Sequence, residues 1–169
     1  MAAAFEDFHS FLCAGKVVSG ETDESAELDE EKANEEWNRL VDSWVLGNVL
    51  LSGSFKDAVV DAMVHQVLMN SVPFDIHTEL YQNSSDSSPV RKLMVDFAVH
   101  LWDEEEISDI DTDDKPEVQA VFLRDVAVAF HKVNQLSKAE QLTNPISTEN
   151  GCFYHEHGAD KPCYKTMFE

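Results

Sequence analysis

SFKDAVVDAMVHQVL, residues 54 to 68, is the stretch that shows most clearly how this chain folds. Apolar side chains recur along it at helical spacing, at Phe55, Val59, Met63 and Val67. Three more apolar residues widen this stripe: Val60, Val64 and Leu68. Because so wide an apolar face must be covered on most of its sides, the stretch predicts a largely buried helix.

Four other segments have the same helical spacing. They cover residues 2–13, 37–51, 89–102 and 116–136. Gly15 ends the first, and Pro89 and Pro116 open the last two, where a helix does not need the N–H that proline lacks. The alternation of period two that marks half-buried strands is almost absent. We therefore predict an all-α fold of about five helices in one compact, bundle-like domain (residues 1–138), followed by an irregular tail (residues 139–169).

Charge is concentrated in two parts of the chain, which has 33 acidic and 12 basic residues and a formal net charge of −21. Residues 21–36 and residues 103–117 each hold nine acids and one lysine, a net charge of −8, which leaves −5 for the rest. Runs of like charge are typical of solvated segments, so we predict acidic loops at residues 19–36 and 103–115. The acidic balance excludes nucleic acid and anionic membrane surfaces as partners, because both require a basic face.

The sequence also predicts where the protein works. It has neither the run of about 18 apolar residues that a membrane span needs nor a basic and then apolar leader. We therefore expect an intracellular protein, cytoplasmic or nuclear. In that compartment Cys13, Cys152 and Cys163 are expected to be thiols or metal ligands rather than a disulfide framework.

The sharpest chemical motif is Cys152-x-x-His155-x-His157-x5-Cys163, near the C-terminus. Thiolate and imidazole are ligands that tetrahedral zinc takes readily, so these four residues are candidate zinc ligands. Their spacing departs from the C-x2-4-C and H-x3-5-H pairs of common zinc modules. The alternative is a tail that lies on the domain without metal, anchored by three aromatic residues: Phe153, Tyr154 and Phe168.

Two other motifs are weaker candidates for a functional site. Asp109-x-Asp111-x-Asp113 resembles the start of a calcium loop, but the sixth and twelfth positions hold Asp114 and Ala120 instead of glycine and glutamate, which favours a solvated loop. His9 and Cys13 lie four residues apart and could pair a base with a thiol, yet nothing nearby supplies an orienting acid or an oxyanion hole. We predict that the chain is not an enzyme.

Five segments of the chain carry a family resemblance. They read FEDFHSFLCAGK (5–16), LVDSWVLGNVL (40–50), FKDAVVDAM (55–63), YQNS (81–84) and SPVRKLMVD (88–96). Their order and spacing resemble the C-terminal half of a fungal BTB/POZ domain with its following helices. The resemblance covers about residues 5–102, with Cys13-Ala14 in place of the usual Tyr-Thr and an acidic insert at 21–36.

The resemblance implies a non-catalytic protein-interaction module. The N-terminal half of a BTB domain, with its strands, its dimerisation surface and most of its cullin-binding surface, is absent from this sequence, so a homo-oligomer or a cullin-type partner rests on family analogy alone. Phe5, Phe8 and Phe11 are the candidate partner-binding residues, because the missing strands would otherwise cover their helix. Alternatively, they pack internally on the helices of Trp44 and Phe55. The rival hypothesis is a small zinc-binding regulatory protein that uses the Cys/His cluster.

Overall fold

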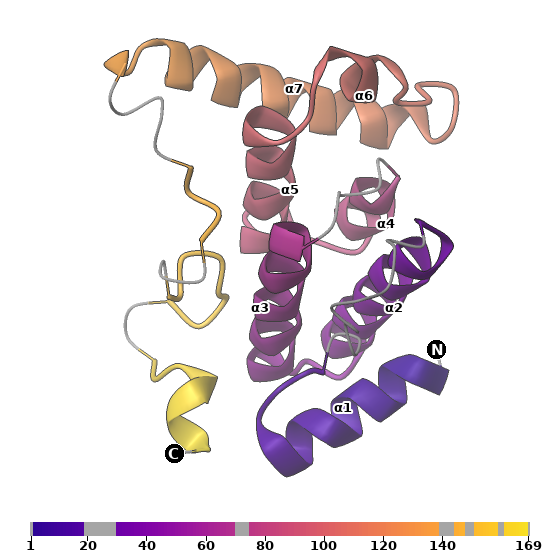
Figure 1. Cartoon of the computed structure of the whole chain (residues 1–169), viewed down its shortest axis with the longest axis vertical. Coiled ribbons are helices and arrows are strands. Elements are labelled where there is room, and N and C mark those ends of the chain that lie inside the picture. The colour runs from indigo at the N-terminus through magenta and orange to yellow at the C-terminus, as the bar shows by residue number, and fades with distance from the viewer. Residues whose placement is uncertain are drawn as a thin grey trace.

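The computed structural model describes residues 2–18, 30–69, 75–138, 144–147, 151–158 and 161–168. Within these ranges it has seven α-helices, one 3-10 helix and no strand, which confirms the all-α prediction (Figure 1). The α-helices are α1 (Ala2–Ala14), α2 (Glu30–Val49), α3 (Gly53–Met69), α4 (Ile76–Gln82), α5 (Pro89–His100), α6 (Glu104–Ser108) and α7 (Pro116–Asn134). The 3-10 helix is η2 (Tyr164–Met167).

The predicted number of about five helices is too low, because the short helices α4 and α6 were not expected. α6 lies inside the predicted acidic loop 103–115, which is therefore wrong as a continuous loop. Its N-cap is Asp103, whose carboxylate accepts hydrogen bonds from the backbone N–H groups of Glu105 and Glu106 at 2.9 and 3.0 Å. The Glu106 side chain accepts from the Asp103 N–H in return. This reciprocal capping box stabilises a helix too short to show periodicity.

The predicted acidic loop 19–36 is also wrong at its end, because α2 begins at Glu30. Residues 19–29 lie outside the described residues. The segment 30–36 is rich in glutamate, which is a good helix former, and its negative charge suits the positive end of the helix dipole. In the other acidic stretch, residues 109–115 hold aspartates instead, which favour turns, and they stay outside the helices.

Helix α3 is the largely buried helix that the sequence predicts. Seven of its apolar side chains are buried: Phe55, Ala58, Val59, Val60, Ala62, Met63 and Val64. Helix α2 contacts α1, α3 and α4, while α5 contacts α4 and α7. As Figure 1 shows, α1 crosses one end of the molecule and α7 crosses the other. The largest aromatic side chains of the core are fully buried between these helices: Trp37, Trp44, Phe55, Phe97 and Phe122.

The C-terminal tail returns to the start of the chain. In Figure 1 it runs beside α3 and ends near α1. Helix η2 contacts α3, and the ring of Phe168 lies 5.6 Å from that of Phe11, centroid to centroid. Phe168 also packs so closely on Gly15, which has a φ of +69°, that no side chain would fit there.

Candidate metal centre

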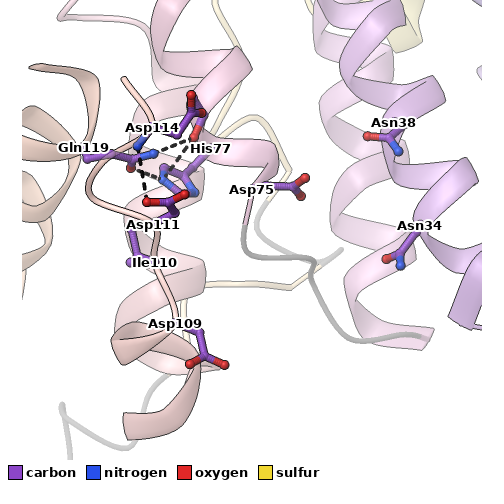
Figure 2. A pocket seen from close by; sticks show the side chains of 10 residues that line it. Asn34, Asn38, Asp75, His77, Asp109, Ile110, Asp111, Asp114 and Gln119 are labelled. Atoms are coloured by element: carbon purple, nitrogen blue, oxygen red, sulfur yellow. Dashed lines mark hydrogen bonds between the residues drawn. The ribbon is translucent and has the colours of Figure 1, made fainter. Parts of the chain in front are cut away.

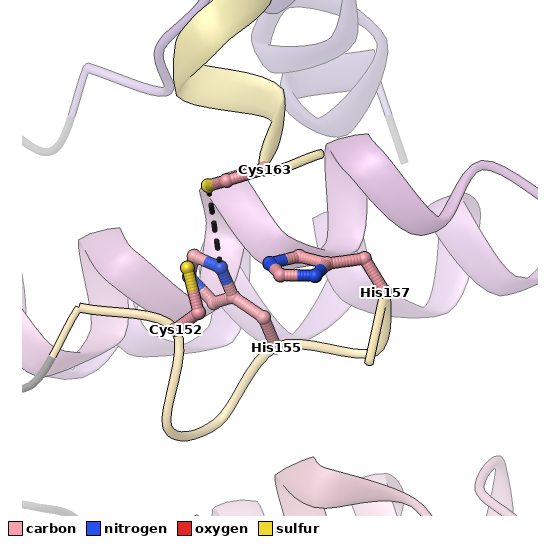
Figure 3. A group of neighbouring side chains, drawn as sticks. All are labelled: Cys152, His155, His157 and Cys163. Carbon is pink, nitrogen blue, oxygen red and sulfur yellow. Dashed lines mark hydrogen bonds between the residues drawn. The ribbon is translucent and has the colours of Figure 1, made fainter. Parts of the chain in front are cut away.

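The tail brings the four predicted ligands together. One ligand atom from each of Cys152, His155, His157 and Cys163 lies within 4.8 Å of the others (Figure 3). The Cys163 Sγ atom is 3.7 Å from His155 Nδ1. Atoms bound to one tetrahedral zinc, at 2.0–2.3 Å from the ion, are about 3.3–3.8 Å apart. The set is thus close to the size that zinc requires, and movements of about 1 Å would complete it.

The two imidazole rings are already held in a metal-binding orientation. His155 Nε2 lies 3.0 Å from Asp61 Oδ1, so Nε2 carries the proton and Nδ1 is turned towards the cysteines. His157 Nδ1 donates to the backbone oxygen of Gly158 at 2.6 Å. Its Nε2 is buried and has no hydrogen-bond partner among the residues that the structure describes. Each ring therefore uses one nitrogen for the protein and presents the other, with its lone pair, to the cluster.

Asp61, on helix α3, supports the ligands from outside the cluster. Besides the hydrogen bond from His155, its carboxylate accepts one from the Tyr164 hydroxyl at 2.5 Å and pairs with Lys165 Nζ at 2.9 Å. Burial raises the pKa of Asp61, but these three hydrogen bonds outweigh it, and the pKa lies below its ordinary value. The carboxylate is thus stably ionised and acts as an acceptor at neutral pH.

Further contacts hold the tail on the helices without touching a ligand side chain. Asp57, one turn before Asp61 on α3, accepts a hydrogen bond from the backbone N–H of Glu156 at 2.6 Å. Glu156 also pairs with Lys56 at 2.5 Å. The Tyr154 hydroxyl donates to Asp96 on α5 at 2.8 Å. The ligand segment is therefore fixed to both α3 and α5 through its side chains and its backbone.

The aspartates that support the cluster are not among the residues predicted from the sequence. Asp57 and Asp61 interrupt the apolar stretch SFKDAVVDAM at a spacing of four, which places both on one face of a buried helix. Buried charges need partners, so this pair predicts that polar groups from elsewhere in the chain dock on α3. That they come from the tail, about 100 positions away, is visible only in three dimensions.

The three aromatic anchors predicted for a metal-free tail differ in how deeply they are buried. Tyr154 is buried, while Phe153 and Phe168 are about half exposed. Phe153 packs edge-on against Tyr154, and Lys92 Nζ lies 4.0 Å from its ring centroid. These contacts are compatible with both interpretations of the tail, since anchoring and metal binding use different side chains.

The three candidate partner-binding phenylalanines do not share one environment. Phe11 is 4% exposed, and the rings of Phe8 and Phe11 lie 5.5 Å or less from that of Phe55. These two pack internally, as the alternative interpretation expects, and Phe11 offers almost no exposed surface. Phe5 is 54% exposed and Leu12 is 59% exposed. Because Leu12 lies seven positions after Phe5, about two helical turns, the two side chains are on the same face of α1.

A cavity of about 660 Å³ lies away from the cysteines. It is lined by Ile110, by Asp75 and by polar residues of α2, α4, α7 and the segment 109–114 (Figure 2). Buried His77 lies on one side, 2.6 Å from Gln119 Oε1. Asp111 accepts hydrogen bonds from the N–H groups of Asp113 and Asp114 at 2.9 and 3.3 Å. The three aspartates are exposed, and the Asp111 carboxylate is turned to the backbone of its own loop, which agrees with the predicted solvated loop.

The motif of His9 and Cys13 has a simple geometry. The Cys13 Sγ atom lies 3.8 Å from His9 Nε2 on the exposed side of α1. Both residues are exposed, and this arrangement follows from their spacing of four on a helix.

No family model matches this chain, and it matches no curated protein and no solved structure. The resemblance to BTB/POZ domains therefore stays a prediction. Among the described helices, none combines the length and the apolar character needed to cross a bilayer.

Proposed function

We propose that this chain is a small zinc-binding helical protein, in which Cys152, His155, His157 and Cys163 hold one structural zinc ion. The observation that carries the proposal is the buried His157 Nε2, which lacks a hydrogen-bond partner among the described residues while Nδ1 of the same ring is engaged by Gly158. A buried polar atom without a partner costs about 1–3 kcal/mol, and a metal bond removes that cost.

The ligand types favour zinc over other divalent ions. Two thiolates and two imidazoles form a borderline-soft set, whereas calcium and magnesium take oxygen ligands. Four protein ligands also fill a tetrahedral site, which leaves no open position for substrate. The metal would thus cross-link the segment 151–158 to Cys163, and its role would be structural or regulatory and not catalytic.

Native mass spectrometry of the full chain, purified with zinc present, tests this proposal. We expect one zinc ion per chain, and none in the double variant Cys152→Ser/Cys163→Ser, because serine is a poor zinc ligand. Cys13→Ser is the matched control, since it removes the remaining cysteine of the sequence, on α1, and should keep the metal. A parent protein that carries no zinc, or a double variant that still carries it, would overturn the proposal.

As a second function we propose that α1 docks a protein partner, as the resemblance to BTB/POZ domains implies. The supporting observation is the exposure of Phe5 and Leu12 on one face of α1. Exposed large apolar side chains on one face are typical of interaction surfaces. With a net charge of −21, the chain would attract a basic partner by electrostatic steering.

Light scattering after size exclusion, with an apolar fluorescent dye as a second readout, tests this surface. We expect the parent chain to self-associate or bind the dye, and Phe5→Ser/Leu12→Ser to reduce both. Val128→Ser removes an exposed apolar residue of α7 and serves as the control, with no expected change. A monomeric parent chain that binds no dye would argue against an α1 interface.

A further inference from the structure

We infer that Asp61 is the positioning residue of the metal centre, and that through it helix α3 becomes part of the zinc site. This inference rests on the proposed zinc function. Asp61 binds no metal in this arrangement. It acts on the ligand His155, whose Nε2–H points at its carboxylate across 3.0 Å.

The contacts of Asp61 reach both halves of the ligand set. One oxygen accepts from His155, a ligand of the segment 151–158. The other accepts from Tyr164 and pairs with Lys165, the two residues that directly follow the ligand Cys163. A single carboxylate thus brings together two tail segments that carry different ligands. The His155 side chain is only 1% exposed, so its ring is held firmly in this position.

The chemical effect of this contact concerns the tautomer of His155. A carboxylate that accepts from Nε2–H keeps the proton on that nitrogen and leaves the lone pair on Nδ1 free for the metal. It also makes the imidazole more basic and fixes its plane, and loss of such a partner typically weakens metal affinity 10- to 100-fold.

Asp57 provides a built-in comparison. It is a buried aspartate of α3, it lies one turn before the partly exposed Asp61, and it also holds the tail. However, its hydrogen bond goes to the backbone N–H of Glu156 and not to a ligand ring. Replacement of Asp57 therefore weakens docking of the tail while the imidazole orientation is kept, whereas replacement of Asp61 affects both.

The experiment compares zinc affinity in the full chain and in Asp61→Ala, Asp61→Asn and Asp57→Asn, by competition with a chromophoric chelator. We expect Asp61→Ala to bind zinc 10- to 100-fold more weakly. Asp61→Asn should lose less, because its amide oxygen still accepts from Nε2–H. Asp57→Asn should lose less affinity than Asp61→Ala, because its amide oxygen still accepts from the Glu156 N–H and the His155 ring keeps its own partner. Circular dichroism verifies that each variant keeps its helices.

A second readout reports on the ring itself. Long-range 1H–15N correlation spectra of the metal-free protein give the tautomer of His155, and we expect its Nε2–H form to be lost in Asp61→Ala and kept in Asp57→Asn. Equal losses of affinity in Asp61→Ala and Asp57→Asn, with an unchanged tautomer, would overturn the positioning role and leave the zinc site intact. A parent chain that binds no zinc would overturn both proposals.

Discussion

Asp7, on α1, is a buried carboxylate at the junction of two helices. It is 3% exposed and accepts hydrogen bonds from the Ser43 hydroxyl at 2.7 Å and from Arg39 at 3.0 Å, both on α2. Burial raises the pKa of Asp7 above its ordinary value, although Ser43 and Arg39 act in the opposite direction. The free-energy cost of removing the ionised carboxylate from water is therefore larger than the stabilisation that its two hydrogen-bond partners provide.

The raised pKa predicts how stability changes with pH. The native chain takes up a proton at Asp7 at a higher pH than the unfolded chain, so the contribution of Asp7 to stability is largest in acid and is lost as pH rises from about 4 through the native pKa. The variant Asp7→Asn carries an amide at this position, which does not titrate. The free energy of unfolding of the parent chain, relative to Asp7→Asn, should therefore fall with rising pH in that window.

Urea titrations of both proteins between pH 4 and pH 7 measure this difference. In Ser43→Ala the free energy of unfolding should fall more with rising pH, because this variant lacks a hydrogen bond that lowers the pKa of Asp7. If the free energy of unfolding of the parent chain, relative to Asp7→Asn, stays constant or grows with pH, the native pKa of Asp7 is not raised.

At the scale of whole helices, periodicity predicts the long elements well. Helix α3 is buried as its stripe requires, and the 116–136 pattern differs from α7 (Pro116–Asn134) by two residues at one end. Such helices are recognisable because many apolar positions repeat the same spacing. α6 has five residues and no buried side chain, and a reciprocal cap stabilises it, so its acids resemble those of a solvated loop.

The candidate metal centre was predictable only in part, because its ligands lie close together in the sequence and the residues that support them do not. The ligand types and their proximity along the chain pointed to zinc, and the structure gathers all four. The supporting carboxylates could not be matched to the ligands, because Asp61 and His155 are separated by 94 positions. Charged residues within the apolar face of α3 indicate that something polar docks there, but a sequence pattern does not specify which segment does so.

For the molecule as a whole, the tail acts as a strap across three helices. It meets α3 through Asp57 and Asp61, α5 through Asp96, and α1 through the packing of Phe168 on Phe11. The largest buried aromatic side chains lie between the helices, and to this core the tail adds Ile146, Tyr154 and Tyr164. A metal in the tail would therefore govern how firmly the strap is closed, while the helices should keep their own packing.

This division predicts the effect of metal removal. A chelator should lower the thermal midpoint, because zinc at 100 times its dissociation constant adds about 2.7 kcal/mol to the free energy of unfolding when it binds only the native state. Hydrogen exchange should become faster at Glu156, whose N–H bonds to Asp57, and should change little in the buried centre of α3. Far-UV circular dichroism below the midpoint should keep its helical signal.

Cys152→Ser/Cys163→Ser, treated in the same way, should show no response to the chelator. If instead the chelator leaves the midpoint and the exchange at Glu156 of the zinc-loaded parent unchanged, the metal does not hold the tail. If α3 exchanges as fast as the tail, the strap and the core are a single cooperative unit.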